Sequence, residues 1–458
     1  MMRKKLALHL LLVPSLTFAN STIDELGKKV QASIQESIVP KGEIVSIDLY
    51  AAPAKVTLHP KVEIDVWTYN GQVPGPLVKI KKGQTLKINF TNNLPQPTTI
   101  HWHGVRVPNA MDGVPGVNQD PIPPGESFQY EFTPKDAGTY WYHPHVRGAE
   151  QVERGLSGSI VVEDIEPRQY DQDIVLHVDD WLIDRDGKLV EDFVTPHDLM
   201  HDGRWGNLIT VNGKSQPEIK VKPGARLRVR LINASNGRVY RPKLGEGLSG
   251  KIIAYDGLYV GEVQEIGSLE LSPGNRMDLD LTVPNQGTEK VALFDDITGE
   301  VIPLATFTTE GEAVQTPGFE IPKDSSFPDT SAAQSLEVKK ELLLQAYRGG
   351  PYGIEWTIDG KIWGEHDPLV LDHKKYQIIG FNNDSFRLHP MHLHGQFFQV
   401  LSRNGVFKPE PFWRDTVLVW PEEKITIGLY PQDKGTWAHH CHILEHAESG
   451  MMNVIQVN

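Results

Sequence analysis

The sequence predicts an all-β protein in which three consecutive domains share one pattern of antiparallel strands. The first observation is a block that recurs three times, as "YNGQVPGPLVKIKKGQTLKINFTNN" (69–93), "VNGKSQPEIKVKPGARLRVRLINAS" (211–235) and, more weakly, "IDGKIWGEHDPLVLDHKKYQIIGFNND" (358–384). Each copy opens near a turn dipeptide, and the three dipeptides stand about one domain length apart. Recurrence at this spacing indicates repeated domains rather than the short units of a solenoid.

A second block supports the same division, as "PPGESFQYEFTPKDAGTYWYH" (123–143), "SPGNRMDLDLTVPNQGTEKVALF" (272–294) and "WPEEKITIGLYPQDKGTWAHH" (420–440). Within the two blocks, "SFQYEF", "LRVRLI" and "KITIGL" alternate apolar and polar residues with a period of two, which is the pattern of half-buried strands. Pro and Gly separate these runs, and few helical runs occur. The pattern therefore favours antiparallel sandwiches or barrels.

The chain opens with the features of a secretory signal peptide. In "MMRKKLALHLLLVPSLTFANS", three basic residues precede an apolar run from Leu6 to Phe18, which ends at a small-residue site. The run is too short to anchor the chain in a bilayer. We therefore expect cleavage after Ala19 and a periplasmic or secreted protein. No twin-arginine pair is present, which indicates export of an unfolded chain and metal loading outside the cytoplasm.

The repeats and the composition set the expected domain boundaries. We expect a signal peptide over 1–19, an N-terminal arm over 20–40, the first domain over 41–166, the second over 167–310 and the third over 335–458. The polar, Pro-containing stretch 311–334 is the expected linker before the third domain.

The charge balance excludes several partners. Lys and Arg number 45 and Asp and Glu 59, so the net charge is −14. This balance argues against nucleic acid and anionic membrane surfaces, and it suits a protein that attracts cations. Apart from the N-terminal run, no apolar stretch approaches the length of a membrane span. We expect a monomer without membrane insertion.

Eleven of the 18 histidines fall in four motifs, "HWHG" (101–104), "YWYHPH" (140–145), "HPMHLHG" (389–395) and "HHCHILEH" (439–446). Aligned without gaps, the first and third domains share four imidazole positions: His101 with His392, His103 with His394, His143 with His440, and His145 with His442. Alternate residues of a strand face the same side, so each His-x-His pair directs both rings one way. If these faces pack together, eight imidazoles meet in one cavity, which suits three metal ions.

The third domain has further candidate ligands. His389, Cys441 and Met451 stand where the first domain has Thr98, Pro144 and Arg154, and His446 completes the set. One cysteine, two histidines and a methionine are the ligands of a blue-copper electron-transfer site. Cys441 is the only cysteine, so it forms no disulfide within the chain. Because Cys441 faces away from its two flanking histidines, an electron at its sulfur could reach either imidazole through a few covalent bonds.

These motifs resemble those of the three-domain multicopper oxidases, which include bacterial laccases and periplasmic copper-tolerance oxidases. All four ligand motifs are complete, and the similarity extends over essentially the whole mature chain. The resemblance implies three consecutive cupredoxin-like Greek-key β-barrel domains and four copper ions. The implied ligands are His101 and His392 for type 2 copper; His103, His143, His145, His394, His440 and His442 for the type 3 pair; and His389, Cys441, His446 and Met451 for type 1 copper.

Enzymes of this family take single electrons from a reductant at type 1 copper and reduce dioxygen to water at the trinuclear cluster. The resemblance implies electron transfer from Cys441 through His440 and His442. It also places Asp112 where similar enzymes have an acidic residue that assists dioxygen reduction, although Asp112 could instead be a turn residue. Some relatives have Glu directly after the histidine matching His446. Here Ala447 comes first and Glu448 second, which leaves the proton route on that side open.

The reductant is open between Cu(I), Fe(II), Mn(II) and phenols or aromatic amines. Copper-tolerance relatives often have a Met-rich insertion in the third domain, whereas this chain has eight Met and none between Met277 and Met391. That disfavours a dedicated thioether site for Cu(I). Two alternatives are not oxidases: a structural relative that has lost copper ligands, which this complete set disfavours, and a copper store, which would consume no oxygen.

Five other residues bear on the site. His197 and His201 in "HDLMHDGRW" have an i, i+4 spacing that could hold zinc, but without an evident third ligand we favour a structural or surface role. Asp415 either orients a metal ligand or ends a sheet. His439 has no counterpart in the first domain, which places it outside the ligand set. We expect Met452 to be a packing neighbour.

Overall fold

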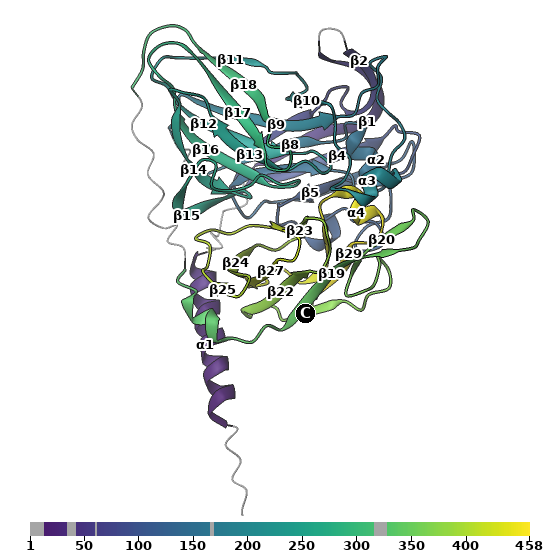
Figure 1. Cartoon of the computed structure of the whole chain (residues 1–458), viewed down its shortest axis with the longest axis vertical. Coiled ribbons are helices and arrows are strands. Elements are labelled where there is room, and N and C mark those ends of the chain that lie inside the picture. Colours follow the sequence, from purple (N-terminus) through teal and green to yellow (C-terminus); the bar gives the residue numbers. More distant parts are fainter. Residues whose placement is uncertain (1–12, 34–42, 60–61, 165–168, 316–327) are drawn as a thin grey trace, which may run out of the picture.

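The computed structural model describes residues 13–33, 43–59, 62–164, 169–315 and 328–458. Most of the regular structure in these residues is β-strand, which confirms the all-β prediction. Figure 1 shows the strands following the chain from the purple and blue first region through teal to the green and yellow third region. The basic residues 3–5 of the predicted signal peptide and residues 316–327 of the predicted linker lie outside the described residues.

The first region contains two four-stranded sheets, with strand orders β2-β1-β4-β6 and β3-β8-β7-β5. In β6 the alternation predicted from "SFQYEF" is present, since Tyr130 and Phe132 are buried and Glu131 between them is exposed. The elements are β1 (Ile44–His59), β2 (Val62–Tyr69), β3 (Gly75–Lys81), β4 (Thr85–Asn92), β5 (His101–His103), η1 (Asn109–Met111), β6 (Ser127–Phe132), β7 (Gly138–His143), α2 (Gly148–Glu153) and β8 (Gly158–Glu163).

The second region contains a six-stranded sheet, β10-β9-β12-β16-β14-β15, and a four-stranded sheet, β11-β18-β17-β13. Its short helix α3 begins at a capping box, in which Thr195 and Asp198 each accept the other's backbone N–H through a side-chain oxygen. The elements are β9 (Gln172–Trp181), α3 (Pro196–Met200), β10 (Leu208–Val211), β11 (Glu218–Val221), β12 (Arg226–Asn233), β13 (Tyr240–Leu244), β14 (Ser249–Tyr255), β15 (Leu258–Glu265), β16 (Arg276–Thr282), β17 (Thr288–Asp295) and β18 (Val301–Thr309).

The third region contains a six-stranded sheet, β20-β19-β22-β27-β24-β25, and a five-stranded sheet, β21-β29-β28-β23-β26. The elements are η3 (Ser331–Ser335), β19 (Lys340–Arg348), β20 (Ile354–Ile358), β21 (Leu369–Leu371), β22 (Gln377–Asn383), β23 (His389–Leu393), β24 (Phe398–Arg403), β25 (Val406–Phe407), β26 (Thr416–Val419), β27 (Lys424–Leu429), β28 (Gly435–Cys441), α4 (Leu444–Glu448) and β29 (Met452–Val457).

The three turn dipeptides, at 70–71, 212–213 and 359–360, adopt the same backbone conformation. Their first residues have φ of 54°, 51° and 52°, and the glycines that follow have φ of 77°, 70° and 70°. Two successive positive φ angles favour Asn or Asp followed by Gly. In each turn the first side chain also accepts a hydrogen bond from a neighbouring strand, from the backbone N–H of Tyr50, His177 or Leu343.

Helix α1 (Val13–Ser33) runs through the predicted cleavage site after Ala19, so most of the predicted arm is helical. Its residues Leu26 and Val30 are buried, and Gly27 lies close to the ring of Tyr430 in the third region. Figure 1 shows α1 at one end of the molecule, with its first turns projecting from the sheets. Among the described residues, no helix is both long and apolar enough to cross a membrane.

Candidate metal centre

Two pairs of antiparallel strands hold the eight matched histidines. In the first region β5 pairs with β7 and sets His101 opposite His143. In the third region β23 pairs with β28 and sets His392 opposite His440. The other four imidazoles follow two residues later in the chain. His103 lies on β5, and the other three lie just beyond the ends of β7, β23 and β28, namely His145, His394 and His442. All eight are buried except His145, which is partly exposed.

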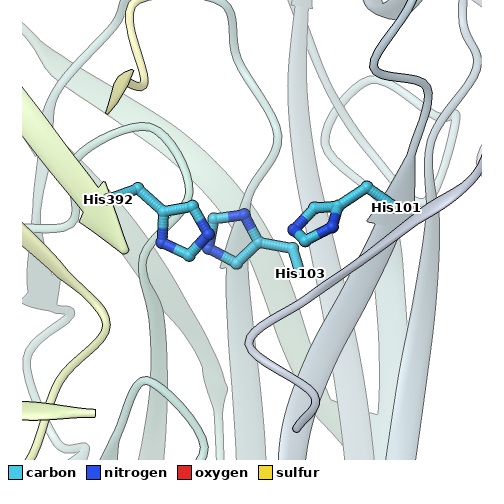
Figure 2. Close-up of side chains that lie close together, drawn as sticks. All are labelled: His101, His103 and His392. Carbon is cyan, nitrogen blue, oxygen red and sulfur yellow. The ribbon is translucent and has the colours of Figure 1, made fainter. Parts of the chain in front are cut away.

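The rings of the two regions meet directly. His101 stacks on His394 and His103 on His392, both with ring centroids 3.8 Å apart. Figure 2 shows His392 reaching from one side toward His103 and His101 on the other. The structure therefore brings together the faces that the period-two pattern predicts.

The ring nitrogens fall into three groups, each with one nitrogen per ring and all nitrogens within 4.8 Å of one another. The groups are His101, His103 and His392; His103, His143 and His442; and His145, His394 and His440. The first contains both predicted type 2 ligands, and the other two divide the six predicted type 3 ligands equally. Each group takes imidazoles from both the first and the third region, so no group is complete within one of them.

Hydrogen bonds fix the tautomer of five of these rings. Each Nδ1–H donates to an oxygen 2.8–3.0 Å away, which places the lone pair on Nε2. The acceptors are backbone carbonyls in four cases and a carboxylate in the fifth: Asp112 O for His101, Pro144 O for His143, Asp415 O for His392, Cys441 O for His440 and Asp112 Oδ2 for His394.

Several of the remaining nitrogens are buried without a hydrogen-bond partner among the described residues. They are Nε2 of His101, His143 and His392, Nδ1 of His103, and both nitrogens of His442. Such orphaned polar atoms are costly in a folded protein unless something binds them. Burial is the largest cause that lowers the pKa of His103, His143, His392 and His442. The rings are therefore neutral with lone pairs available, which is what a copper ligand requires.

The four predicted type 1 residues are all completely buried. The Cys441 sulfur lies 3.6 Å from His389 Nδ1 and 3.8 Å from His446 Nδ1, and the two nitrogens lie 3.2 Å apart. Both imidazoles use Nε2 for other hydrogen bonds, to Ser385 Oγ and to the His201 carbonyl, so both Nδ1 atoms face the sulfur. Met451 is anchored beside them, because its carbonyl accepts the Cys441 N–H.

The donor set of this second cluster fits a soft metal ion. Burial raises the pKa of Cys441, so the thiol needs a bound cation to persist as thiolate. One thiolate and two imidazoles in a dry site match copper better than zinc or a hard cation. The neighbouring His440 and His442 belong to the eight-histidine cluster, while Cys441 belongs to this one. The backbone from 440 to 442 therefore joins the two centres.

Comparisons with known proteins agree with this chemistry. Family models described as multicopper oxidase match residues 51–167, 172–304 and 335–458.

The chain belongs to the multicopper oxidases.

The relatives support this assignment over most of the chain. Multicopper oxidase mco of Staphylococcus aureus is 30% identical over 403 residues, which cover 85% of this chain and 83% of that protein. The solved multicopper oxidase of Pseudomonas thermotolerans is 33% identical with a TM-score of 0.79, and the match covers 91% of this chain and 99% of that one. A Campylobacter jejuni multicopper oxidase titled a metallo-oxidase is 27% identical, with a TM-score of 0.76 and coverage of 92% and 96%. The predictions of three cupredoxin-like domains, of copper binding and of an oxidoreductase that uses dioxygen are confirmed at the level of the family.

Asp112 links the two regions of this oxidase at the cluster. Its carboxylate lies 3.3 Å from His101 Nδ1 and 2.9 Å from His394 Nδ1, and Asn118 also donates to it. Burial alone would raise the pKa of Asp112, but electrostatic attraction to and hydrogen bonds from His394 and His101 outweigh burial and hold that pKa well below its ordinary value. The side chain is thus a buried carboxylate that orients two imidazoles rather than a simple turn residue.

Asp415, which the sequence left between two roles, lies in the protein interior beside the cluster. It lies within 3.4 Å of His103 Nε2 and of His392 Nδ1. Arg276 of the middle region donates to both of its carboxylate oxygens, at 2.9 and 2.6 Å. Asp256 accepts the backbone N–H of Asp415. Asp415 therefore positions imidazoles, and the middle region supplies the positive charge that stabilises it.

The middle region also covers the cluster with backbone. A Cβ added at Gly274 would lie 2.9 Å from His103 and 2.9 Å from His442, and φ at Gly274 is +87°. Glycine alone fits so close to the two rings in this conformation. The sequence of this domain contains no candidate ligand, so the contributions of Gly274, Arg276 and Asp256 were not predicted.

A pocket of about 200 Å³ lies beside the cluster. Its lining includes His143, His145 and His440 of the cluster together with Ala447 and Glu448. Burial raises the pKa of Glu448. Glu448, one residue further along the chain than the Glu of some relatives, therefore lines the same pocket as three imidazoles of the cluster.

The remaining predicted residues lie outside the three nitrogen groups. His439 is buried, and its Nδ1 lies 2.7 Å from Asn453 Oδ1. Met452 packs against Val114 and Ala438. His197 and His201 lie in and just after α3, with their rings stacked 4.2 Å apart.

Proposed function

We propose that this oxidase binds four copper ions, one of type 1, one of type 2 and two of type 3, and couples one-electron oxidation of a reductant to the four-electron reduction of dioxygen to water. The single observation that supports this coupling most strongly is the arrangement at 440–442, where the Cys441 sulfur lies in one donor cluster and both flanking imidazoles lie in the other. Bound copper would supply the one-electron transfers and the reduction of dioxygen.

The chain's own residues position and insulate these groups. Backbone carbonyls hold the protons of His101, His143, His392 and His440 on Nδ1, so their Nε2 lone pairs are fixed before metal arrives. Asp112 and Asp415 place negative charge beside the cluster, where it favours cations. Asp112 and Glu448 are the acidic side chains that we assign to proton delivery, one between His101 and His394 and one in the pocket wall.

The reductant belongs to one of two classes, a metal ion such as Cu(I) or a phenol or aromatic amine. Relatives of both kinds are similar to this chain. The Campylobacter jejuni protein is titled a metallo-oxidase, and an Ochrobactrum protein that is 26% identical is titled a laccase-like multicopper oxidase. The protein acts as a monomer outside the cytoplasm, in the periplasm or secreted, after removal of residues 1–19. Mass spectrometry of the N-terminus of exported protein tests the cleavage site.

The central test uses the copper-loaded protein. We expect a blue protein whose intense thiolate-to-copper absorption is lost in Cys441→Ser, because only this residue offers a thiolate. His101→Asn should keep the blue colour, since His101 lies in the other cluster, and should stop oxygen uptake with a phenol as reductant. His59→Asn, at an exposed position of β1, is the matched control and should change neither property.

Two results would refute the proposal. A colourless copper-loaded protein would remove the type 1 assignment. A blue protein that binds copper but consumes no oxygen with Cu(I), Fe(II), Mn(II) or a phenol would instead be a copper store.

A further inference from the structure

His446, one of the predicted type 1 ligands, lies beneath α3. The His446 ring is fully buried, so a reductant cannot touch it. Its Nε2–H donates to the His201 carbonyl at 2.8 Å. Trp356 stacks on the His446 ring with centroids 4.1 Å apart and donates its Nε1–H to the Leu199 carbonyl. The end of α3 is therefore held directly over the type 1 ligands, and the His201 peptide is the contact between His446 and the surface segment.

This surface segment, "HDLMH" (197–201), presents two imidazoles and a thioether. The His197 and His201 rings stack 4.2 Å apart at an angle of 20°. The His201 Nδ1–H donates to the His197 carbonyl at 2.7 Å. This hydrogen bond places the ring proton on Nδ1, so Nε2 of His201 has a lone pair that can bind a metal ion. The side chain of His197 is 77% exposed. Both rings line a pocket of about 480 Å³ between the second and third regions.

Met200 is the third candidate ligand, and its exposure is unusual for this chain. It is 47% exposed, whereas the other methionines in the described part of the chain are buried or half-buried. His197 and Met200 stand three residues apart in α3, and His201 is the residue that caps its C-terminal end, so the three side chains project from one short segment. Imidazole and thioether ligands together favour Cu(I) over harder ions.

The carboxylates of the pocket already have partners. Asp202 lies 3.3 Å from Arg387 Nη1. Asp198 accepts the Thr195 N–H in the capping box of α3 and lies 3.9 Å from Arg204. Fe(II) and Mn(II) prefer oxygen ligands more than Cu(I) does, and here the oxygen ligands are neutralised by arginine or used within α3. The soft ligands are the ones left available.

We propose that His197, Met200 and His201 form a binding site for Cu(I) as the reducing substrate of this enzyme, an inference that rests on the function proposed above. Cu(I) at this site is oxidised to Cu(II), and its electron leaves through the His201 carbonyl and the hydrogen bond to His446. Dioxygen, the electron acceptor of the family's activity, takes up four such electrons and four protons to give two waters. The site needs no Met-rich insertion, since its thioether comes from the second domain.

The test uses the copper-loaded holoenzyme and Ag(I), which has the charge and ligand preference of Cu(I) but gives up no electron. Isothermal titration should show one tight Ag(I) site in the wild type. We expect Met200→Leu and the double variant His197→Asn/His201→Asn each to weaken Ag(I) binding at least tenfold with the blue absorption retained. In oxygen uptake, the ratio of kcat/KM for Cu(I) to kcat/KM for 2,6-dimethoxyphenol should fall at least tenfold. His59→Asn is the control and should match the wild type in both measurements.

Unchanged Ag(I) affinity in both variants would overturn the site, as would an absence of Ag(I) binding to the wild type. Equal losses of Cu(I) and phenol oxidation would overturn it as well, because they would indicate damage to the shared electron path at His446. If the proposed function is wrong, the wild type should instead consume no oxygen with any reductant. In that case the Ag(I) titration still tests whether the site exists.

Discussion

Replacing Arg276 with Met should strongly destabilise the copper-free oxidase, because this side chain joins all three regions in the protein interior. The guanidinium is fully buried and donates to the Thr139 carbonyl in the first region, to the Gly274 and Asp256 carbonyls in the second, and to both Asp415 oxygens in the third. Methionine keeps most of the apolar stem and removes every one of these hydrogen bonds.

The magnitude follows from the charge that is left behind. Burial alone would raise the pKa of Asp415, but Arg276 is the chief cause that holds it below its ordinary value, so Asp415 is a carboxylate opposite a guanidinium. Burial and the charge of Asp415 raise the pKa of Asp256 to about 7. Removing one partner of a buried ion pair costs about 3–5 kcal/mol. At about 1 °C per kcal/mol for a cooperative unit of this length, Tm should fall by about 3–5 °C.

Differential scanning calorimetry of the copper-free variants measures this change. Lys220→Met is the matched control, since the Lys220–Glu310 ion pair lies exposed on the surface of the same region and should contribute little to stability. Arg276→Met/Asp415→Asn should recover part of the loss, because the double variant leaves no unpaired charge at position 415. An Arg276→Met protein that unfolds within 2 °C or so of the wild type would refute the reasoning.

Three further changes test the surroundings of the cluster and the pH dependence of stability. Gly274→Ala places a Cβ within 2.9 Å of two imidazoles, so oxygen uptake should fall at least tenfold while the blue absorption is retained. Gly299→Ala, in an open turn, is the control and should behave as the wild type. Equal activities of the two variants would exclude tight packing at position 274. Asp112→Asn keeps a hydrogen-bond acceptor for the imidazoles but removes the negative charge. Oxygen uptake with a phenol should therefore fall about 10–100-fold while the blue colour is unchanged. Full activity of this variant would exclude a role for the charge. Burial lowers the pKa of His177 from 6.5 to about 3, so as pH falls the unfolded chain binds a proton at this residue before the folded protein does. The wild type should therefore lose about 1.4 kcal/mol of stability per pH unit below 6.5 through His177. His177→Asn should not show this loss. Urea unfolding at pH 7 and pH 5 measures the difference, and equal losses for the two proteins would contradict the assignment.

Short-range patterns predicted much of the fold and the ligand geometry. The period-two rule placed both imidazoles of each His-x-His pair on one face and Cys441 on the other, because strand geometry depends on local backbone conformation alone. Comparing the first and third domains then indicated which faces meet. The structure brings the eight imidazoles together as that comparison predicts.

Other features depend on contacts that no local pattern contains. Arg276 stands in "SPGNRMD", where nothing distinguishes it from a surface arginine, and its partner Asp415 is 139 residues away. Gly274 matters only because two rings from other domains lie against it. The helical course of α1 through position 19 was likewise not predicted, because the apolar run there was interpreted as a cleaved segment. The cleavage site and the domain boundaries stay predictions.

The division of each nitrogen group between distant segments has a consequence for biosynthesis. Every group needs at least one ring from residues 101–145 and at least one from residues 392–442. A ribosome must therefore translate nearly the whole message before any of the three groups has all its nitrogens. A chain that ends before residue 392 therefore completes none of the three groups, and a metal that needs a full group can bind only after much of the third region has been made.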